Sequence, residues 1–335
     1  MPSFGHGCDA LARTAHRPPQ HGIMGPVSTR RSFLAGLAGG VALASAAAAR
    51  ADDPPAGALA SRAPPDFTVL DLDTGGDRKL ATRFTLFVPN HLARDEQVPL
   101  LVLLHGLGET GDPTLGVYAW VERYGLGTAY ARLRRPPVGH TTRQLGLLPD
   151  PRLAAINAAL AAQPFRGMAI ACPVTPNVGK MPAPEAALDA YAAWIAEVVI
   201  PRARKEAPVL AGAAHTAIDG VSLGGYVGLE VFLRRREAFA AWGGVQSAIN
   251  VVRLTAYADK LAAALATAPP GSRASLHLET TEADPYREIN TALAALLTKK
   301  GVPNDLVILA GLHDQVFLRE AGTLEMLLWH DRRLR

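Results

Sequence analysis

The sequence predicts an α/β fold in which a mostly parallel sheet carries helices on both faces. Short apolar runs alternate with longer stretches of helical spacing from about residue 84 to residue 329, the succession expected of βαβ units. The run at 99–104 is apolar throughout, which is typical of a parallel strand covered on both faces. With 335 residues, 49% of them hydrophobic, the chain is long and apolar enough for one large domain.

Seven apolar runs predict the strands, in order at 84–88, 99–104, 168–172, 217–219, 242–245, 274–278 and 305–309. Periodic apolar residues predict helices between them, at 118–134, 184–206, 223–236, 257–268, 285–300 and 316–329. Pro173 ends the third strand, and Pro285 stands at a first helical position, which suits proline. Leu188, Tyr191 and Ile195 give the helix at 184–206 one apolar face. Ligands of such sheets bind at the carboxyl ends of the strands, so residues there are the candidates for chemistry.

Residues 1–51 are predicted to be a leader that directs export. Arg30 and Arg31 precede an Ala- and Gly-rich apolar run at 33–49, a pattern that resembles a twin-arginine signal. The run is too short to span a bilayer and no cysteine follows it, so no stable membrane anchor is expected. Cleavage after this leader leaves a linker at 52–66 and a catalytic domain at 67–335. Met24 is a plausible true start.

The leader also accounts for the net charge of the chain. Its five arginines and one aspartate equal the formal net charge of +4, so the remaining residues are neutral overall. We therefore expect no nucleic-acid partner. The two cysteines are Cys8 and Cys172, so the processed chain has no intrachain disulfide and no thiolate zinc cluster. The precursor is expected to engage the twin-arginine export machinery, and the protein to be periplasmic or secreted.

A nucleophilic serine is predicted where the fourth strand ends. Gly220-Val221-Ser222-Leu223-Gly224 has the G-x-S-x-G spacing, with a strand before it and a helix after it. The turn is so tight that both glycine positions must be nearly free of side chain. It lifts the Ser222 hydroxyl above the sheet at a helix N-terminus, where the N–H of Leu223 is ready to hold an oxyanion.

A second oxyanion donor is expected after the strand at 99–104. His105-Gly106-Leu107-Gly108 follows that strand, and its glycines let the backbone turn an amide inward. The N–H of Leu107 is the favoured donor and that of Gly108 the alternative. His105 itself is expected to hold the loop rather than act as a base.

The general base is predicted to be His313. It follows the last strand and the turn at 310–312, and therefore lies at the same edge of the sheet as Ser222. Its carboxylate partner is predicted to be Asp284, which gives the chain order Ser, Asp, His. Glu282 is the rival acid, and a role for Asp284 as a mere helix cap stays open.

These motifs resemble those of serine esterases of the α/β-hydrolase superfamily, in the style of esterase D, feruloyl esterases and enterochelin esterases. The resemblance runs from about residue 84 to residue 329 and is carried by the segments 103–106, 220–225, 284–285 and 311–314. It implies hydrolysis of a small-molecule carboxylic ester through an acyl-serine intermediate, without a metal or organic cofactor.

Three other functions stay open at this point: a peptidase, an acyltransferase, and a catalytically silent hydrolase-like binding protein. The chain departs from the family pattern at 135–167, a long Pro- and Leu-rich connection. This connection is either a lid over the acyl pocket or a solvated excursion that packs one short helix at 153–161.

Overall fold

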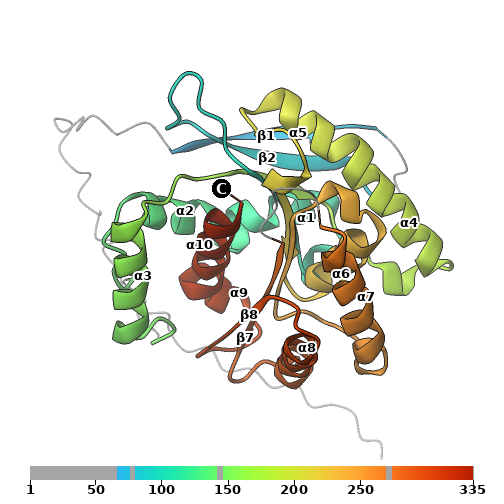
Figure 1. Cartoon of the computed structure of the whole chain (residues 1–335). Helices are drawn as coiled ribbons and strands as arrows, with labels where there is room; N and C mark the ends of the chain where they lie inside the picture. The colour runs from blue at the N-terminus through green and yellow to red at the C-terminus, as the bar shows by residue number, and fades with distance from the viewer. Residues whose placement is uncertain (1–65, 76–79, 142–145, 269–273, 335) are drawn as a thin grey trace, which may run out of the picture. The chain divides into compact units, whose positions relative to one another are not determined.

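The computed structural model describes residues 66–75, 80–141, 146–268 and 274–334. Its centre is a single eight-stranded sheet (Figure 1). The strands are β1 (Phe67–Asp73), β2 (Arg83–Pro89), β3 (Leu100–Leu104), β4 (Ala169–Pro173), β5 (Thr216–Gly220), β6 (Ala241–Val245), β7 (Ser275–Thr281) and β8 (Asn304–Leu309).

The sheet is parallel from β4 onward. Its spatial order is β1-β2-β4-β3-β5-β6-β7-β8; β1 pairs with β2 and β2 with β4 in antiparallel fashion, and all other pairs are parallel. The carboxyl ends of β3 and β5 to β8 therefore meet at one edge, where the predicted site residues follow them.

Ten α-helices are described, some of them joined by short π-helical segments. They are α1 (Pro113–Tyr118), α2 (Leu126–Arg134), α3 (Asp150–Ala162), α4 (Pro184–Trp194), α5 (Ile200–Glu206), α6 (Leu223–Arg234), α7 (Leu254–Ala266), α8 (Arg287–Lys299), α9 (Gln315–Phe317) and α10 (Thr323–Arg333). The joining turns are η2 (Ala119–Arg123) between α1 and α2, η4 (Ile195–Val199) between α4 and α5, and η8 (Leu318–Gly322) between α9 and α10. Separate short turns are η1 (Leu107–Glu109), η3 (Val178–Lys180), η5 (Ala213–His215), η6 (Arg236–Ala238) and η7 (Val251–Arg253).

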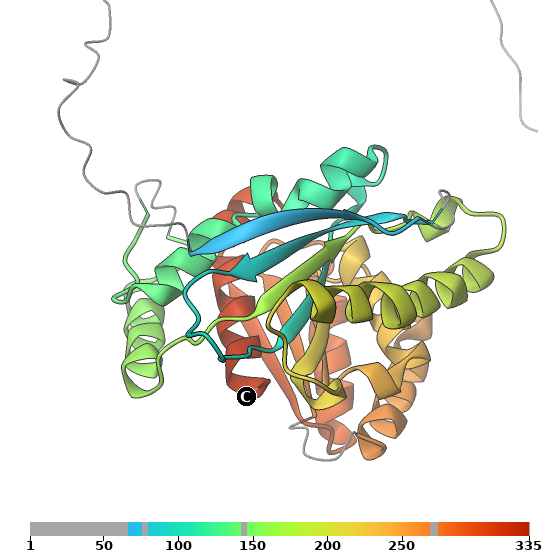
Figure 2. The ribbon, with the colours of Figure 1, turned by 90° about the horizontal axis from the view of Figure 1, so that it is seen from above.

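The helices form two layers, one on each face of the sheet (Figure 2). Buried residues of α1 and of α4 to α8 pack in one apolar cluster, and those of α2, α3, α9 and α10 pack in the other. Strand β3 shows why the central strands are apolar throughout. Leu100, Val102 and Leu104 point into the first cluster, whereas Leu101 and Leu103 point into the second.

All seven predicted strands are present, with ends that shift by at most a few residues. Strand β1 was not predicted. The helix expected at 118–134 is interrupted at Gly125, whose φ is +74° and where a Cβ would lie 2.9 Å from the Cα of Arg319. The left-handed backbone at this position interrupts the helix, and the close approach of Arg319 leaves room only for a glycine.

The leader at 1–51, with Arg30, Arg31 and Met24, and nearly all of the linker at 52–66 lie outside the described residues. Within the described ranges, no helix is both long enough and apolar enough to span a bilayer.

Candidate active site

Ser222 lies on a sharp turn between β5 and α6. Its backbone has φ 56° and ψ −116°, in a region that residues other than glycine rarely adopt. Ser222 directly precedes the first residue of α6, so its side chain lies at the positive end of that helix. A strained residue between a strand and a helix is the geometry that the G-x-S-x-G spacing predicts.

The glycines on either side of Ser222 are required by close backbone contacts. A Cβ on Gly220 would lie 2.5 Å from the carbonyl carbon of Gly224, and a Cβ on Gly224 would collide with the carbonyl oxygen of Leu104. The second contact is with the end of β3, so the turn is packed directly against the neighbouring strand. The two glycines therefore allow the turn to fit where it does.

The structure brings His313 and Asp284 together. The Nδ1 of His313 lies 2.9 Å from Oδ1 of Asp284, a hydrogen bond between the loops that follow β8 and β7. The Asp284 side chain is fully buried and also accepts hydrogen bonds from Thr280 Oγ1 (2.5 Å) and the N–H of Tyr286 (3.0 Å). Glu282 is exposed, so the structure places Asp284 rather than the rival acid on His313.

These hydrogen bonds keep Asp284 ionised. Burial by itself raises the pKa of the Asp284 carboxyl, but the hydrogen bonds from His313, Thr280 and Tyr286 outweigh that effect and lower the pKa below its usual value. Asp284 therefore carries its negative charge at neutral pH. An ionised carboxylate on Nδ1 fixes the tautomer in which Nε2 of His313 is free to accept a proton.

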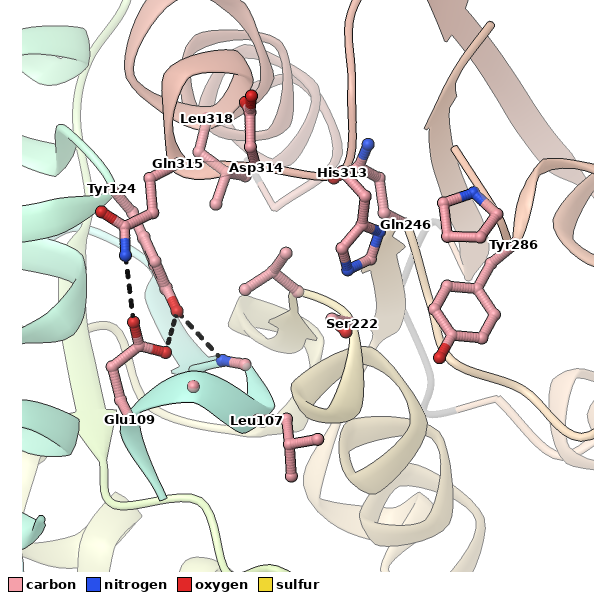
Figure 3. Close-up of a pocket in the computed structure, with 14 residues that line it drawn as sticks. Leu107, Glu109, Tyr124, Ser222, Gln246, Tyr286, His313, Asp314, Gln315 and Leu318 are labelled. Carbon is pink, nitrogen blue, oxygen red and sulfur yellow. Dashed lines mark hydrogen bonds between the residues drawn. The ribbon is translucent and has the colours of Figure 1, made fainter. Parts of the chain in front are cut away.

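Ser222 and His313 line the same cavity, which has a volume of about 400 Å³. Figure 3 shows the imidazole above Ser222, with the nitrogen that does not face Asp284 directed toward the serine. Tyr286 packs against the imidazole, with ring centroids 5.4 Å apart. Nucleophile and base thus face one another across a small space that is open to a ligand.

Of the two expected oxyanion donors, Leu107 is among the residues that line this cavity, whereas Leu223 is not and only adjoins Ser222. Leu107 begins η1, and Leu223 is the first residue of α6. Neither the N–H of Leu107 nor that of Leu223 has a hydrogen-bond partner among the described residues. Both groups are available to a ligand atom. Gly108, the alternative donor, also lines the cavity.

His105 is buried and holds the loop, as the sequence predicts. Its Nδ1 is 2.9 Å from the carbonyl oxygen of Gly106, and its Nε2 is 2.8 Å from the N–H of Thr175. A carbonyl only accepts and an amide N–H only donates, so the ring has its proton on Nδ1. Burial lowers the pKa of His105, in agreement with a neutral ring.

A polar cluster that the sequence analysis missed lines the wall opposite Ser222 (Figure 3). Tyr124 donates a hydrogen bond to Glu109 and accepts one from the N–H of Gly106 at 3.3 Å. Gln315 donates to the other oxygen of Glu109 at 3.3 Å. The Glu109 carboxylate is 3% exposed and thus ties the loop of Leu107 to the segment after His313. The sequence signal that could have pointed to Glu109 is its position in the loop that follows β3.

The connection at 135–167 packs into the second apolar cluster rather than standing free. Leu147, Leu148, Leu153 and Ile156 are buried there, and the short helix expected at 153–161 is α3. Among its described residues, which exclude 142–145, none lines the cavity of Ser222.

No protein-family model matches this chain, and no curated protein sequence matches it either. Several solved structures are similar in fold. A ferulic acid esterase is 17% identical, with 80% of this chain and 99% of that chain covered and a TM-score of 0.58. The S-formylglutathione hydrolase of Staphylococcus aureus is 16% identical over 79% of this chain and 96% of its own, with a TM-score of 0.51. A fluorophosphonate-binding serine hydrolase of the same organism is 15% identical over 79% and 98%, with a TM-score of 0.52.

At these identities the likeness concerns the fold. The chain has the α/β-hydrolase fold.

Proposed function

We propose that this protein is a serine hydrolase that cleaves carboxylic esters through an acyl-serine intermediate. In this proposal Ser222 is the nucleophile, His313 the general base and Asp284 the acid that orients the base. The observation that carries it is the strained turn at Ser222, which opens onto the same cavity as a histidine bonded to a buried, ionised carboxylate. The esterases and serine hydrolases among the similar structures support the same reaction class.

In the acylation half of the reaction, Nε2 of His313 takes the hydroxyl proton of Ser222 while the serine oxygen bonds to the ester carbonyl carbon. The electron pair of the carbonyl bond moves to its oxygen, and the N–H groups of Leu223 and Leu107 hold the oxyanion. The tetrahedral intermediate then collapses. The bond to the alcohol oxygen breaks, and that oxygen takes the proton from His313, which leaves the acyl group on Ser222.

In the deacylation half, water replaces the alcohol. His313 takes a proton from the water, whose oxygen bonds to the acyl carbon and regenerates the oxyanion between the same two amides. Collapse releases the carboxylic acid, and Ser222 recovers its proton from His313. Asp284 stays ionised throughout and stabilises the imidazolium that forms in each half.

The test combines labelling with kinetics. Ser222→Ala is expected to lower kcat on p-nitrophenyl esters roughly 10⁶-fold and to abolish labelling by a fluorophosphonate probe, while the circular dichroism stays that of wild type. Ser247→Ala is the matched control. It removes a buried hydroxyl that has no partner among the described residues, and it should leave labelling intact.

Two outcomes would contradict the proposal. Full esterase activity in Ser222→Ala would show that another group is the nucleophile. Wild-type protein that is neither labelled nor active on esters from acetate to palmitate, or on feruloyl and aryl esters, would indicate a hydrolase-like binding protein instead.

We further propose that the precursor is exported already folded through the twin-arginine pathway. The proposal rests on Arg30 and Arg31 before the apolar run at 33–49. Replacing both arginines with lysine should retain the precursor in the cytoplasm, as measured by fractionation, whereas unchanged export of this variant would contradict the proposal.

A further inference from the structure

Gln246, like Ser222, has a positive φ. Among the described residues, these are the two non-glycine residues with positive φ, 56° at Ser222 and 50° at Gln246. They are also joined through the backbone. The N–H of Ser222 donates to the carbonyl of Val245 at 2.9 Å, and the N–H of Gln246 donates to the carbonyl of Glu279 at 2.6 Å. Gln246 thus directly follows Val245, the residue whose carbonyl accepts the backbone hydrogen bond of Ser222.

The Gln246 side chain connects the loops of the acid and the base. It is 1% exposed, and its Nε2 donates to Thr281 Oγ1 at 3.0 Å and to the carbonyl of Leu312 at 2.9 Å. Because a carbonyl only accepts, the second bond fixes which end of the amide is nitrogen. Thr281 accepts the N–H of Asp284 at 3.2 Å, and Leu312 directly precedes His313. One amide therefore spans both loops.

The rest of Gln246 is unfavourable for stability. Its Oε1 is buried without a hydrogen-bond partner among the described residues, and its backbone adopts a conformation that suits glycine. Both features lower the free energy of unfolding, and both concentrate at functional sites. A side chain that served only to fill space would need neither a donor toward Leu312 nor an unpaired oxygen.

We propose that Gln246 is a positioning residue of this reaction, which fixes the loop of His313 to the loop of Asp284 so that the imidazole faces Ser222. The inference rests on the proposed function, because it requires His313 to be the base. Gln246 lines the cavity, but its side-chain hydrogen bonds go to Thr281 and Leu312 rather than to Ser222 or the His313 ring, so in this proposal it acts through His313. Its bond to Leu312 is one residue from the base, and a displacement of about 1 Å in a reacting group lowers a rate roughly 10²-fold.

Two variants test the role of the amide. Gln246→Met keeps the length of the side chain and removes the donor, and Gln246→Gly removes the side chain but relieves the backbone at positive φ. Both are expected to lower kcat by roughly 10²-fold with KM within about twofold of wild type, and to slow fluorophosphonate labelling of Ser222 in proportion. The glycine variant distinguishes the effect of losing the amide from the effect of the backbone conformation, because relief of backbone strain alone would not lower kcat.

Asn157 provides the control. It is a half-buried amide of α3 whose Oδ1 accepts the N–H of Val138 at 2.6 Å and whose Nδ2 donates to the carbonyl of Val138 at 2.9 Å, in a segment of which no described residue lines the cavity. Asn157→Leu is expected to lower the urea midpoint while kcat stays within about twofold of wild type. A loss of kcat that accompanied any loss of stability would appear in this variant as well, and would contradict the positioning role.

The failures of the two proposals are distinguishable. If wild-type Ser222 is not labelled, the proposed function fails and this inference fails with it. If wild type is labelled and Gln246→Met retains the wild-type kcat and labelling rate, only the inference is overturned. A rise in KM at unchanged kcat would also overturn it, because Gln246 would then contribute to substrate binding rather than to the position of His313.

Discussion

Replacement of the buried Glu279 by glutamine is expected to stabilise the protein, and to do so increasingly as the pH rises. Glu279 lies in β7, is fully buried, and has no hydrogen-bond partner on either carboxylate oxygen among the described residues. The nearest base is His277, whose Nε2 is 3.7 Å away and beyond hydrogen-bond distance. Burial, reinforced by the charges of Glu325 and Asp219, raises the pKa of Glu279 well above its usual value.

The sign of the effect follows from where the proton sits. In the unfolded chain a glutamate loses its proton above its ordinary pKa of 4.5, whereas folded Glu279 keeps it. The unfolded state therefore binds fewer protons than the folded state, and stability falls as the pH rises from that value up to the folded pKa. The fall is about 1.4 kcal/mol per pH unit while the folded carboxyl stays protonated. Glutamine has the same size and no proton to lose, so Glu279→Gln removes this slope.

The assay is urea unfolding of wild type and Glu279→Gln in matched buffers from about pH 5 to about pH 8. The contributions of all other titrating groups cancel in the difference between the two free energies of unfolding. This difference should grow as the pH rises, with the variant the more stable of the two. Glu279→Met, which cannot ionise either, should give the same slope. If the difference is flat, or if the variant becomes less stable than wild type as the pH rises, then Glu279 is ionised and paired with His277, and the reasoning is refuted.

Three further predictions concern the cavity and the turn. Asp284→Asn should lower kcat roughly 10⁴-fold on p-nitrophenyl acetate, because an amide no longer fixes the productive tautomer of His313, and unchanged kcat would argue that Asp284 is only a helix cap. Gly224→Ala should lower the free energy of unfolding by about 1–3 kcal/mol in thermal melts, whereas Gly139→Ala, where a Cβ meets no atom within 4 Å, should leave it nearly unchanged; equal effects would contradict the packing argument. Glu109→Gln removes a negative charge from the cavity wall. It should improve kcat/KM for the anionic mono-p-nitrophenyl succinate roughly fivefold relative to the neutral butyrate ester. An unaltered ratio of the two kcat/KM values would show that this carboxylate does not select substrates by charge.

The main architecture could be predicted because each strand carries its own local signal. The run at 99–104 is apolar throughout since both faces of β3 are covered by helices, and such a run ends where the loop to the site begins. Candidates chosen from the residues after these runs include Ser222, Asp284 and His313. The structure places Ser222 and His313 on one cavity and Asp284 in contact with His313.

Strand β1 was not predicted because it is an antiparallel edge strand in which no residue is fully buried. Its residues are half-buried or exposed, and Asp71 and Asp73 lower its apolar content. The need for a glycine at Gly125 could not be predicted for a different reason. It arises from the close approach of Arg319, which is far away in the sequence and close only in the folded chain.

The importance of Gln246 depends on the register between strands, which no single strand reveals. Val221 pairs with Val245, and Val245 pairs with Glu279, so the residues that follow them, Ser222, Gln246 and Thr280, form one row across the carboxyl edge of the sheet. That row places Ser222 beside Gln246, at the point where both backbones turn to positive φ. Because side chains alternate between the faces of a sheet, a slip of one residue in either pairing would send the amide of Gln246 away from the loop of His313. The strand ends therefore supply the candidates, and the register determines which of them can act together.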